Sequence, residues 1–316
     1  MKKLCLKLLC VALPFLLYFG VFVAFDPADY FGVNHASTAG NSVVTRVKRF
    51  VGAPQNAIIL GDSRMAHFDM DLVREVSGRT WSNLAFGGAS MNESIDLFWL
   101  AVQQNPAIDA VVFEASFYTL RQGDTRNRTE AILTAVRNPA AYLFNFNYNV
   151  DMLQNILEHV KHWRNPNYVI GEATDTGHWT PADYLDENGA PLPYRANLIE
   201  YAGTIRDVCA GYSLNEDNLS ALLEVAAYCK ENNIALTFVL PPVDGAIREY
   251  VLEGLELWPA LARIKSALSA TGARVLDYEY EPAVTFSEDQ FYDGFHLDIV
   301  KGLPQYTEIL FKEVLA

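Results

Sequence analysis

The chain has 316 residues, of which 51% are hydrophobic, so it can bury one large core or two modest ones and is not a disordered protein. The formal net charge is −14, and the part that follows Lys7 carries 38 acidic residues against 21 basic ones. Because phosphate binding requires clustered lysine and arginine, this acidic balance argues against nucleic acid as a partner.

The N-terminus carries three lysines, at positions 2, 3 and 7, and residues 8–25 that follow are uncharged. Together with residues 4–6, this segment is long enough to cross a bilayer. The lysines predict a cytoplasmic N-terminus and an extracytoplasmic location for everything after Phe25. We interpret residues 1–25 as a cytoplasmic tail and an uncleaved signal anchor with one transmembrane helix. A cleaved signal peptide and a buried core helix are the alternatives.

After a juxtamembrane connector over residues 26–52, short apolar runs alternate with amphipathic stretches. The predicted strands cover residues 57–60, 80–86, 109–116, 234–240 and 273–277. The predicted helices cover residues 70–75, 92–104, 216–231, 255–270 and 299–314. Near-continuous apolar strands separated by amphipathic helices indicate a parallel sheet that is covered on both faces. We therefore predict an α/β domain over residues 53–316, with three layers (α/β/α) and a mostly parallel sheet.

An aromatic-rich insertion at about residues 120–215 interrupts this alternation. An insertion of this length is expected to pack at the carboxyl ends of the strands and shape the ligand site, to form a small core of its own, or to do both. Cys209 and Cys229 fall in the predicted outer domain, where a disulfide is permitted. The apolar neighbours of Cys229 favour two buried thiols instead.

Two short motifs suggest nucleophilic catalysis. Gly61-Asp62-Ser63-Arg64 directly follows the first predicted strand, and Asp293-Gly294-Phe295-His296 precedes the last predicted helix. A serine hydroxyl is a poor nucleophile until an imidazole takes its proton, and the imidazole needs a carboxylate to fix its tautomer. The sequence therefore predicts a triad in which Ser63 is the nucleophile, His296 the general base and acid, and Asp293 the orienting carboxylate.

These motifs, with the glycine that follows the second strand, resemble those of the SGNH, or GDSL, hydrolase superfamily over roughly residues 54–316. The second block of that superfamily matches Asn83-Leu84-Ala85-Phe86-Gly87-Gly88. The resemblance implies that the backbone N–H of Gly88 joins that of Ser63 in binding the oxyanion. The third block normally ends in an asparagine that completes the oxyanion hole. Here Tyr118 stands closest to that position, so its phenol or the hydroxyl of Ser116 would have to substitute.

Three further charged residues lie in or near these motifs and at the end of the third strand. Asp62 is expected to have a structural role, in which its side chain stabilises the turn that contains Ser63. Arg64 is interpreted either as a surface cation or as a contact to the oxyanion or substrate. Glu114, in the third strand, either pairs with an arginine or contributes to the site. The predicted chemistry requires no metal and no organic cofactor.

The predicted layout resembles the membrane-anchored branch of the superfamily, which accompanies membrane-bound O-acyltransferases. That branch includes the D-alanine transfer protein of lipoteichoic acid assembly and acetyltransferases of exopolysaccharides. The resemblance implies an extracytoplasmic esterase or O-acyltransferase that acts on a cell-envelope polysaccharide or a teichoic-acid-like polymer through an acyl group on Ser63. The alternative is a non-catalytic accessory that presents a polymer or carrier to a membrane-bound O-acyltransferase.

Overall fold

The computed structural model describes residues 2–33, 42–166 and 194–315, and it divides the chain into two compact units. The first unit comprises residues 1–52 and 130–173, and the second comprises residues 53–129 and 174–316. The boundary after residue 52 coincides with the predicted start of the α/β domain. The predicted insertion, in contrast, is split between the units, because residues 130–173 cluster with the N-terminal segment.

The second unit is built on a five-stranded sheet in the order β2-β1-β3-β4-β5, and all neighbouring strands are parallel. The strands are β1 (Ala57–Leu60), β2 (Ser82–Asn83), β3 (Ala110–Glu114), β4 (Ala235–Leu240) and β5 (Arg274–Asp277). All residues of β1 and β3 are buried, as expected of apolar central strands. The chain order reverses between β1 and β3, and a crevice at the carboxyl ends of strands forms at such a point. Ser63 follows β1 directly, so the fold places it there.

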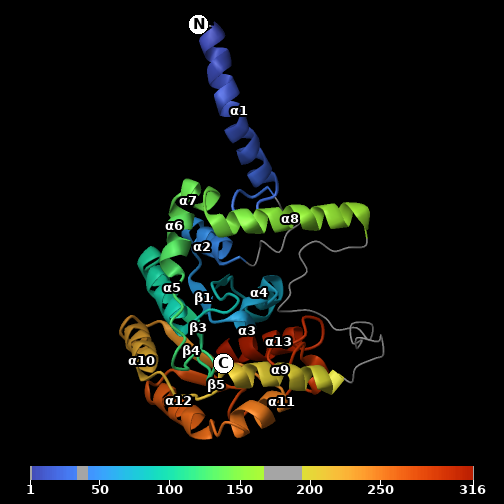
Figure 1. Cartoon of the computed structure of the whole chain (residues 1–316). Coiled ribbons are helices and arrows are strands. Elements are labelled where there is room, and N and C mark those ends of the chain that lie inside the picture. Colours follow the sequence, from blue (N-terminus) through green and yellow to red (C-terminus); the bar gives the residue numbers. More distant parts are fainter. Residues whose placement is uncertain (1, 34–41, 167–193, 316) are drawn as a thin grey trace. The chain divides into compact units, whose positions relative to one another are not determined.

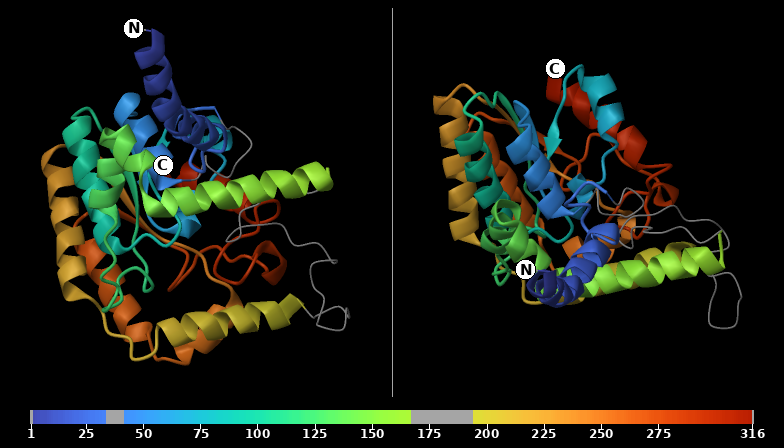
Figure 2. Two further views of the ribbon diagram at one scale, coloured as in Figure 1. Left: turned by 45° about the horizontal axis from the view of Figure 1, so that its top comes forward. Right: turned by 90° about the horizontal axis from the view of Figure 1, so that it is seen from above.

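Helices lie on both faces of this sheet (Figure 2). Helices α5, α10 and α12 pack side by side, whereas α4 packs against α13. The main helices of the unit are α4 (Met70–Ser77), α5 (Met91–Gln104), α9 (Tyr194–Val208), α10 (Glu216–Glu231), α12 (Trp258–Ala270) and α13 (Leu303–Leu315). Shorter elements are α3 (Ser63–Ala66), α11 (Gly245–Ile247), a π-helical segment (Arg248–Glu253) and a 3₁₀ turn (Glu288–Gln290). The predicted α/β fold with a parallel sheet is confirmed.

Local sequence explains where several of these helices begin and end. Ser90 and Glu93 form a reciprocal capping box at the start of α5, which satisfies two backbone N–H groups that the helix leaves unpaired. Asp69 caps the start of α4, and Gly78 ends it with a positive φ of 65°. The second strand covers only two residues and is shorter than predicted, although the backbone N–H groups of Leu84 and Phe86 still donate to Ile59 and Gly61. The side chain of Asn83, at the end of this strand, donates to the backbone oxygens of Met65 and Ala66.

The first unit contains α1 (Lys2–Ala24), α2 (Val43–Gly52), α7 (Pro139–Leu143) and α8 (Phe146–Arg164) (Figure 1). Helix α6 (Thr129–Arg137) belongs to this unit from residue 130 onward. Tyr142 explains why the insertion joins the N-terminal segment: its ring stacks on Tyr30 at 4.3 Å, and its hydroxyl donates to Asp26 at 2.5 Å. The aromatic residues of this part of the insertion therefore build a core with the connector. The rest of the predicted insertion between residues 167 and 193 lies outside the described residues.

Within the described parts of the chain, we find no helix that combines the length and the apolar character needed to cross a membrane. Cys209 and Cys229 are both buried and carry free thiols, so the interpretation of two ordinary buried cysteines holds and the permitted disulfide is absent between them.

Gly61, which joins β1 to the turn of Ser63, has no room for a side chain. A Cβ built on it would lie 2.6 Å from Oε2 of Glu114 and 2.8 Å from Cγ of Met65, and its φ of 154° favours glycine. We expect Gly61→Ala to lower the free energy of unfolding by about 1–3 kcal/mol, because overpacking forces backbone and side chains apart. Chemical denaturation measures the change. Gly203→Ala is the matched control, because nothing lies within 4 Å of its Cβ in α9. Equal stability of the two variants would contradict the account.

Candidate active site

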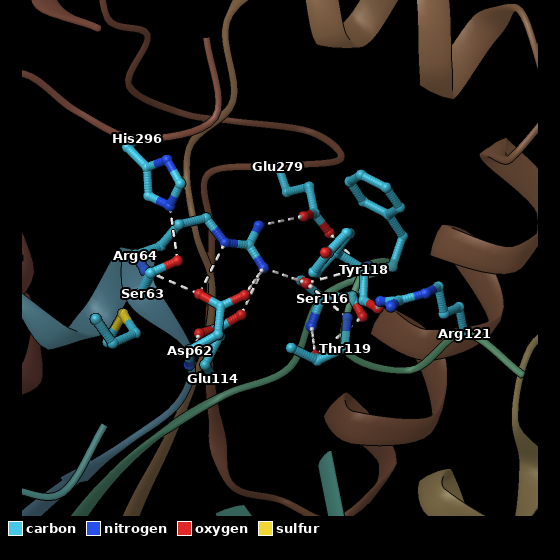
Figure 3. A network of polar contacts seen from close by, with 12 residues as sticks. Asp62, Ser63, Arg64, Glu114, Ser116, Tyr118, Thr119, Arg121, Glu279 and His296 are labelled. Atoms are coloured by element: carbon cyan, nitrogen blue, oxygen red, sulfur yellow. Dashed lines mark hydrogen bonds and ion pairs between the residues drawn. The ribbon is translucent and has the colours of Figure 1, made fainter. Parts of the chain in front are cut away.

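Ser63, His296 and Asp293 are brought together in the second unit, although 233 residues separate the serine from the histidine. Figure 3 shows the Ser63 side chain facing the imidazole of His296. Oγ of Ser63 lies 2.6 Å from Nε2 of His296, and Nδ1 of His296 lies 2.8 Å from Oδ2 of Asp293. A carboxylate only accepts hydrogen bonds, so Nδ1 carries the proton and Nε2 presents its lone pair to the serine hydroxyl. This is the arrangement that general-base activation of a serine requires.

Asp293 holds the histidine through the backbone as well as through the imidazole. Its Oδ1 accepts from the backbone N–H of His296 at 2.7 Å and from that of Phe295 at 3.0 Å. Both carboxylate oxygens therefore fix the same short turn, and the three-residue spacing of the motif makes this possible. The three triad side chains are largely buried, which keeps water from competing for these hydrogen bonds.

The nucleophile is positioned by the short helix α3, which begins at Ser63. Asp62 caps this helix: its Oδ1 accepts from the backbone N–H of Arg64 at 2.8 Å. This hydrogen bond gives Asp62 the structural role expected of it, which is to hold the turn at Ser63 in place. Asn83, from the second motif block, donates to Met65 and Ala66, which ties that block to the same helix.

Arg64 points into the interior and lies at the centre of a buried polar network (Figure 3). Its side chain is only 3% exposed. Nη2 contacts Asp62 at 2.9 Å and Glu114 at 2.6 Å, and Nη1 lies 3.5 Å from Glu279. The guanidinium also donates to Oγ of Ser116 at 2.6 Å. Neither interpretation of Arg64 from the sequence, a surface cation or a substrate contact, describes this geometry, because the side chain is buried and carboxylates occupy its donors.

The carboxyl groups around Arg64 differ in their proton affinity. Burial would raise the pKa of Asp62, but the adjacent Arg64 outweighs burial and holds that pKa below its ordinary value. For Glu114, burial prevails over Arg64 and raises the pKa well above the ordinary value. Burial likewise raises the pKa of Glu279 to about 8. One ionised aspartate therefore balances the arginine, while the two glutamates retain protons to higher pH.

The raised pKa of Glu279 predicts a pH effect on stability. The ordinary pKa is 4.5, so between about pH 4.5 and 8 the folded chain holds a proton that the unfolded chain releases. The free energy of unfolding must therefore fall as pH rises through this window. We expect Glu279→Gln to make that fall shallower by about 1 kcal/mol or more, as measured by urea unfolding at pH 5 and pH 8. Glu281→Gln, at an exposed position, is the control and should leave the slope unchanged.

The two other predicted oxyanion residues lie in loops at strand ends. Gly88 stands in the turn between β2 and α5 with a φ of 61°, and its carbonyl accepts from Arg128 at 2.9 Å. Tyr118 follows β3, and its ring centroid lies 5.0 Å from that of Phe295, next to His296. Ser116, the alternative donor, is fully buried and bonded to Arg64. Oxyanion binding by Gly88 and Tyr118 remains a prediction, whereas the Ser116 hydroxyl is directed into the interior.

Sequence reasoning missed three residues around the triad. Glu279 follows β5, and the general rule that sites form at the carboxyl ends of parallel strands could have found it. Phe295 lies inside the C-terminal motif, and its ring covers the Arg64 guanidinium at 4.1 Å. Tyr201 comes from α9, and its ring centroid lies 6.2 Å from that of His296. No sequence signal connects α9 with the site. Among the described residues, no group of His, Cys, Asp or Glu is arranged to hold a metal ion.

No protein-family model matches the sequence, and a search of curated proteins finds no match either. Among solved structures, a GDSL-like lipase from Bacteroides thetaiotaomicron is similar to this chain, with a TM-score of 0.38 and 12% sequence identity. The likeness covers 87% of this chain and 98% of that one.

Proposed function

We propose that this protein is a serine-dependent acyl-transfer enzyme, either an O-acyltransferase or an esterase, that forms an acyl intermediate on Ser63. One observation carries the proposal: Oγ of Ser63, the imidazole of His296 and the carboxylate of Asp293 form a continuous chain of hydrogen bonds of 2.6 and 2.8 Å. A module that only binds has no physical need for a buried serine aligned with the unprotonated nitrogen of an oriented imidazole.

The chemistry follows from the positions of the protons. As Oγ of Ser63 attacks the acyl carbonyl carbon, Nε2 of His296 takes the hydroxyl proton, and Asp293 stabilises the imidazolium. The bond to the leaving oxygen breaks, and that oxygen receives the proton from His296. An acceptor hydroxyl then loses its proton to Nε2 and attacks the acyl-serine, and Ser63 recovers its proton as the acyl group departs. Water as acceptor gives hydrolysis, and a sugar hydroxyl gives transfer.

We further propose that the acceptor is a cell-envelope polysaccharide or a teichoic-acid-like polymer, with a membrane-bound O-acyltransferase as a candidate partner. The support is the order of features along the chain. Three lysines precede an uncharged apolar segment, and the acidic remainder follows it. In α1, many apolar side chains are exposed, including Leu8, Phe15 and Leu17. Exposed apolar side chains in such number suit a lipid environment, so the proposal places the N-terminus in the cytoplasm and the site outside it.

The test uses the full chain in detergent, an activated acetyl ester as donor and a short envelope-type oligosaccharide as acceptor. The proposal predicts that, when the reaction is quenched early, one acetyl group is found attached to Ser63. At later times, acetylated sugar or free acetate should appear. The ratio of these two products distinguishes transfer from hydrolysis. A folded protein that never carries acetyl on Ser63 would contradict the enzyme proposal.

A second candidate function rests on the third motif block. That block ends without an asparagine, and its Ser116 hydroxyl is used inside the buried network around Arg64. A weaker oxyanion hole would suit an accessory that binds a polymer or carrier and presents it to a membrane-bound acyltransferase. In the acetylation experiment, such an accessory would bind the oligosaccharide without forming acyl-Ser63.

A further inference from the structure

Helix α8 in the first unit carries an unusually apolar exposed face. Phe146 is 79% exposed, Leu153 57%, Leu157 60% and Trp163 82%. Leu153 and Leu157 are one turn apart, and Phe146 lies two turns before Leu153, so these three side chains form one stripe along the helix. Trp163 lies near the end of the helix and about 120° around it from Leu157. Soluble surfaces rarely expose a contiguous set of large apolar side chains without a partner.

The rest of α8 follows a different pattern. Met152 and Asn155 are buried, and Nδ2 of Asn155 donates to the backbone oxygen of Phe25, just after α1, at 3.1 Å. Gln154 and Asp151 lie on a third side and are exposed. The helix therefore has one side that packs on the end of α1, one polar side and one exposed apolar side. This is the distribution expected of a helix that lies at a boundary between water and an apolar phase.

Contacts with α1 indicate which way the apolar stripe faces. The hydroxyl of Tyr18, about two turns before the end of α1, lies 2.7 Å from the side-chain oxygen of Asn149. Asn149 is one turn before Leu153 on the same side of α8. The ring of Phe144, just before α8, stacks on Tyr18 at 6.1 Å. The stripe thus adjoins the side of α8 that meets the body of α1, away from the connector at Phe25.

The direction of α8 fits the same boundary. Figure 1 shows α8 running crosswise to α1 within this unit, so α8 would lie along the surface of a bilayer to which residues 1–25 attach the chain, as proposed above. The last turn of α8 is basic, with Lys161, His162 and Arg164, and Trp163 stands among them. Tryptophan and basic side chains are both favoured at the level of lipid headgroups.

We propose that α8 is an interfacial helix whose apolar stripe, defined by Phe146, Leu153 and Leu157, is inserted among the headgroups and upper acyl chains of a lipid bilayer, with Trp163 at the level of the headgroups. This inference rests on the proposed membrane attachment through residues 1–25. It adds a second contact with the membrane, which would fix the orientation of the first unit at the surface. The occupant is lipid, and a protein surface is the alternative that the test must exclude.

The experiment measures lipid contact at single positions of α8 in the full chain. A bimane probe is attached to Leu157→Cys on the stripe or to Gln154→Cys on the polar side, with Cys5 and Cys10 replaced by alanine. Cys209 and Cys229 are buried and remain. Each labelled protein is placed in phosphatidylcholine nanodiscs with or without bromine on the acyl chains. We expect brominated lipid to remove most of the emission at position 157 and little of it at position 154.

The other outcomes overturn the inference in distinguishable ways. A chain that resists alkaline carbonate extraction but shows no quenching at position 157 is anchored, and α8 then lies off the bilayer. Blue-shifted emission at position 157 without quenching means that protein covers the stripe. A chain that carbonate releases from the membrane lacks the proposed anchor, and both membrane contacts fail together. None of these results alters the chemistry proposed for Ser63.

Discussion

Ser63→Ala is expected to reduce turnover of an activated ester by about 10³-fold or more, without lowering the stability of the fold. The substitution removes the hydroxyl oxygen that lies 2.6 Å from Nε2 of His296 and would carry the acyl group, so covalent chemistry cannot start. Stability should change little, because the lost hydroxyl leaves His296 bonded to Asp293. Initial rates with the activated acetyl ester and thermal unfolding followed by circular dichroism measure both quantities.

Ser220→Ala provides the matched control for this loss. Ser220 is exposed on α10, so its removal applies the same chemical change away from the site. Its rate should equal that of the wild type. Residual turnover of Ser63→Ala within a few-fold of the control would mean that another group performs the reaction, and the Ser63 mechanism would have to be abandoned.

Arg64→Leu is expected to lower the free energy of unfolding by about 3–5 kcal/mol at neutral pH, because it leaves a buried carboxylate without a counter-charge. Arg64 contacts Asp62 and Glu114 at 2.9 and 2.6 Å, and the pKa of Asp62 lies below its ordinary value because of this arginine. Without Arg64, Asp62 must take up a proton or remain charged inside the protein. The loss of stability should therefore become smaller as pH falls and protonation becomes easier. Urea unfolding at pH 5 and pH 8 tests both the size and the sign.

Two further variants separate charge from packing. Arg64→Lys keeps a cation but loses the planar fork that reaches several acceptors at once, so its stability should fall between those of the wild type and Arg64→Leu. Arg74→Leu removes an arginine whose pair with Asp71 is exposed, and such pairs contribute about 0–1 kcal/mol. If Arg64→Leu were no more destabilising than Arg74→Leu, the buried network could not be what holds the turn of Ser63.

The sheet and the triad could be predicted because their signals are local. Four apolar residues between turn signals define β1, and the structure starts and ends that strand at Ala57 and Leu60 as expected. Helix α10 also has its predicted bounds, since Asn215 caps its start with a side-chain hydrogen bond to Asn218. Asp293 stands three residues before His296 in the same motif. This spacing is short enough for the carboxylate to reach the imidazole within one turn of the chain, so the contact could be predicted from the sequence.

The role of Arg64 could not be predicted, because it depends on contacts made across the fold. Its partners come from the turn after β1, from β3 and from the segment after β5, and only tertiary structure brings Glu114 and Glu279 to one guanidinium. The grouping of residues 130–173 with the N-terminal segment was missed for the same reason. Tyr142 and Asp26 form a hydrogen bond although 116 residues separate them in the sequence, and no periodic pattern of residues predicts such a contact.

The most direct test of the central claim is fluorophosphonate labelling of the full chain, with the adduct located by mass spectrometry in wild type and in His296→Ala. The account predicts a single adduct on Ser63 in the wild type, which is strongly reduced in His296→Ala although the variant stays folded. A folded wild type without an adduct, or an adduct that forms at the same rate in His296→Ala, would contradict activation of Ser63 by His296.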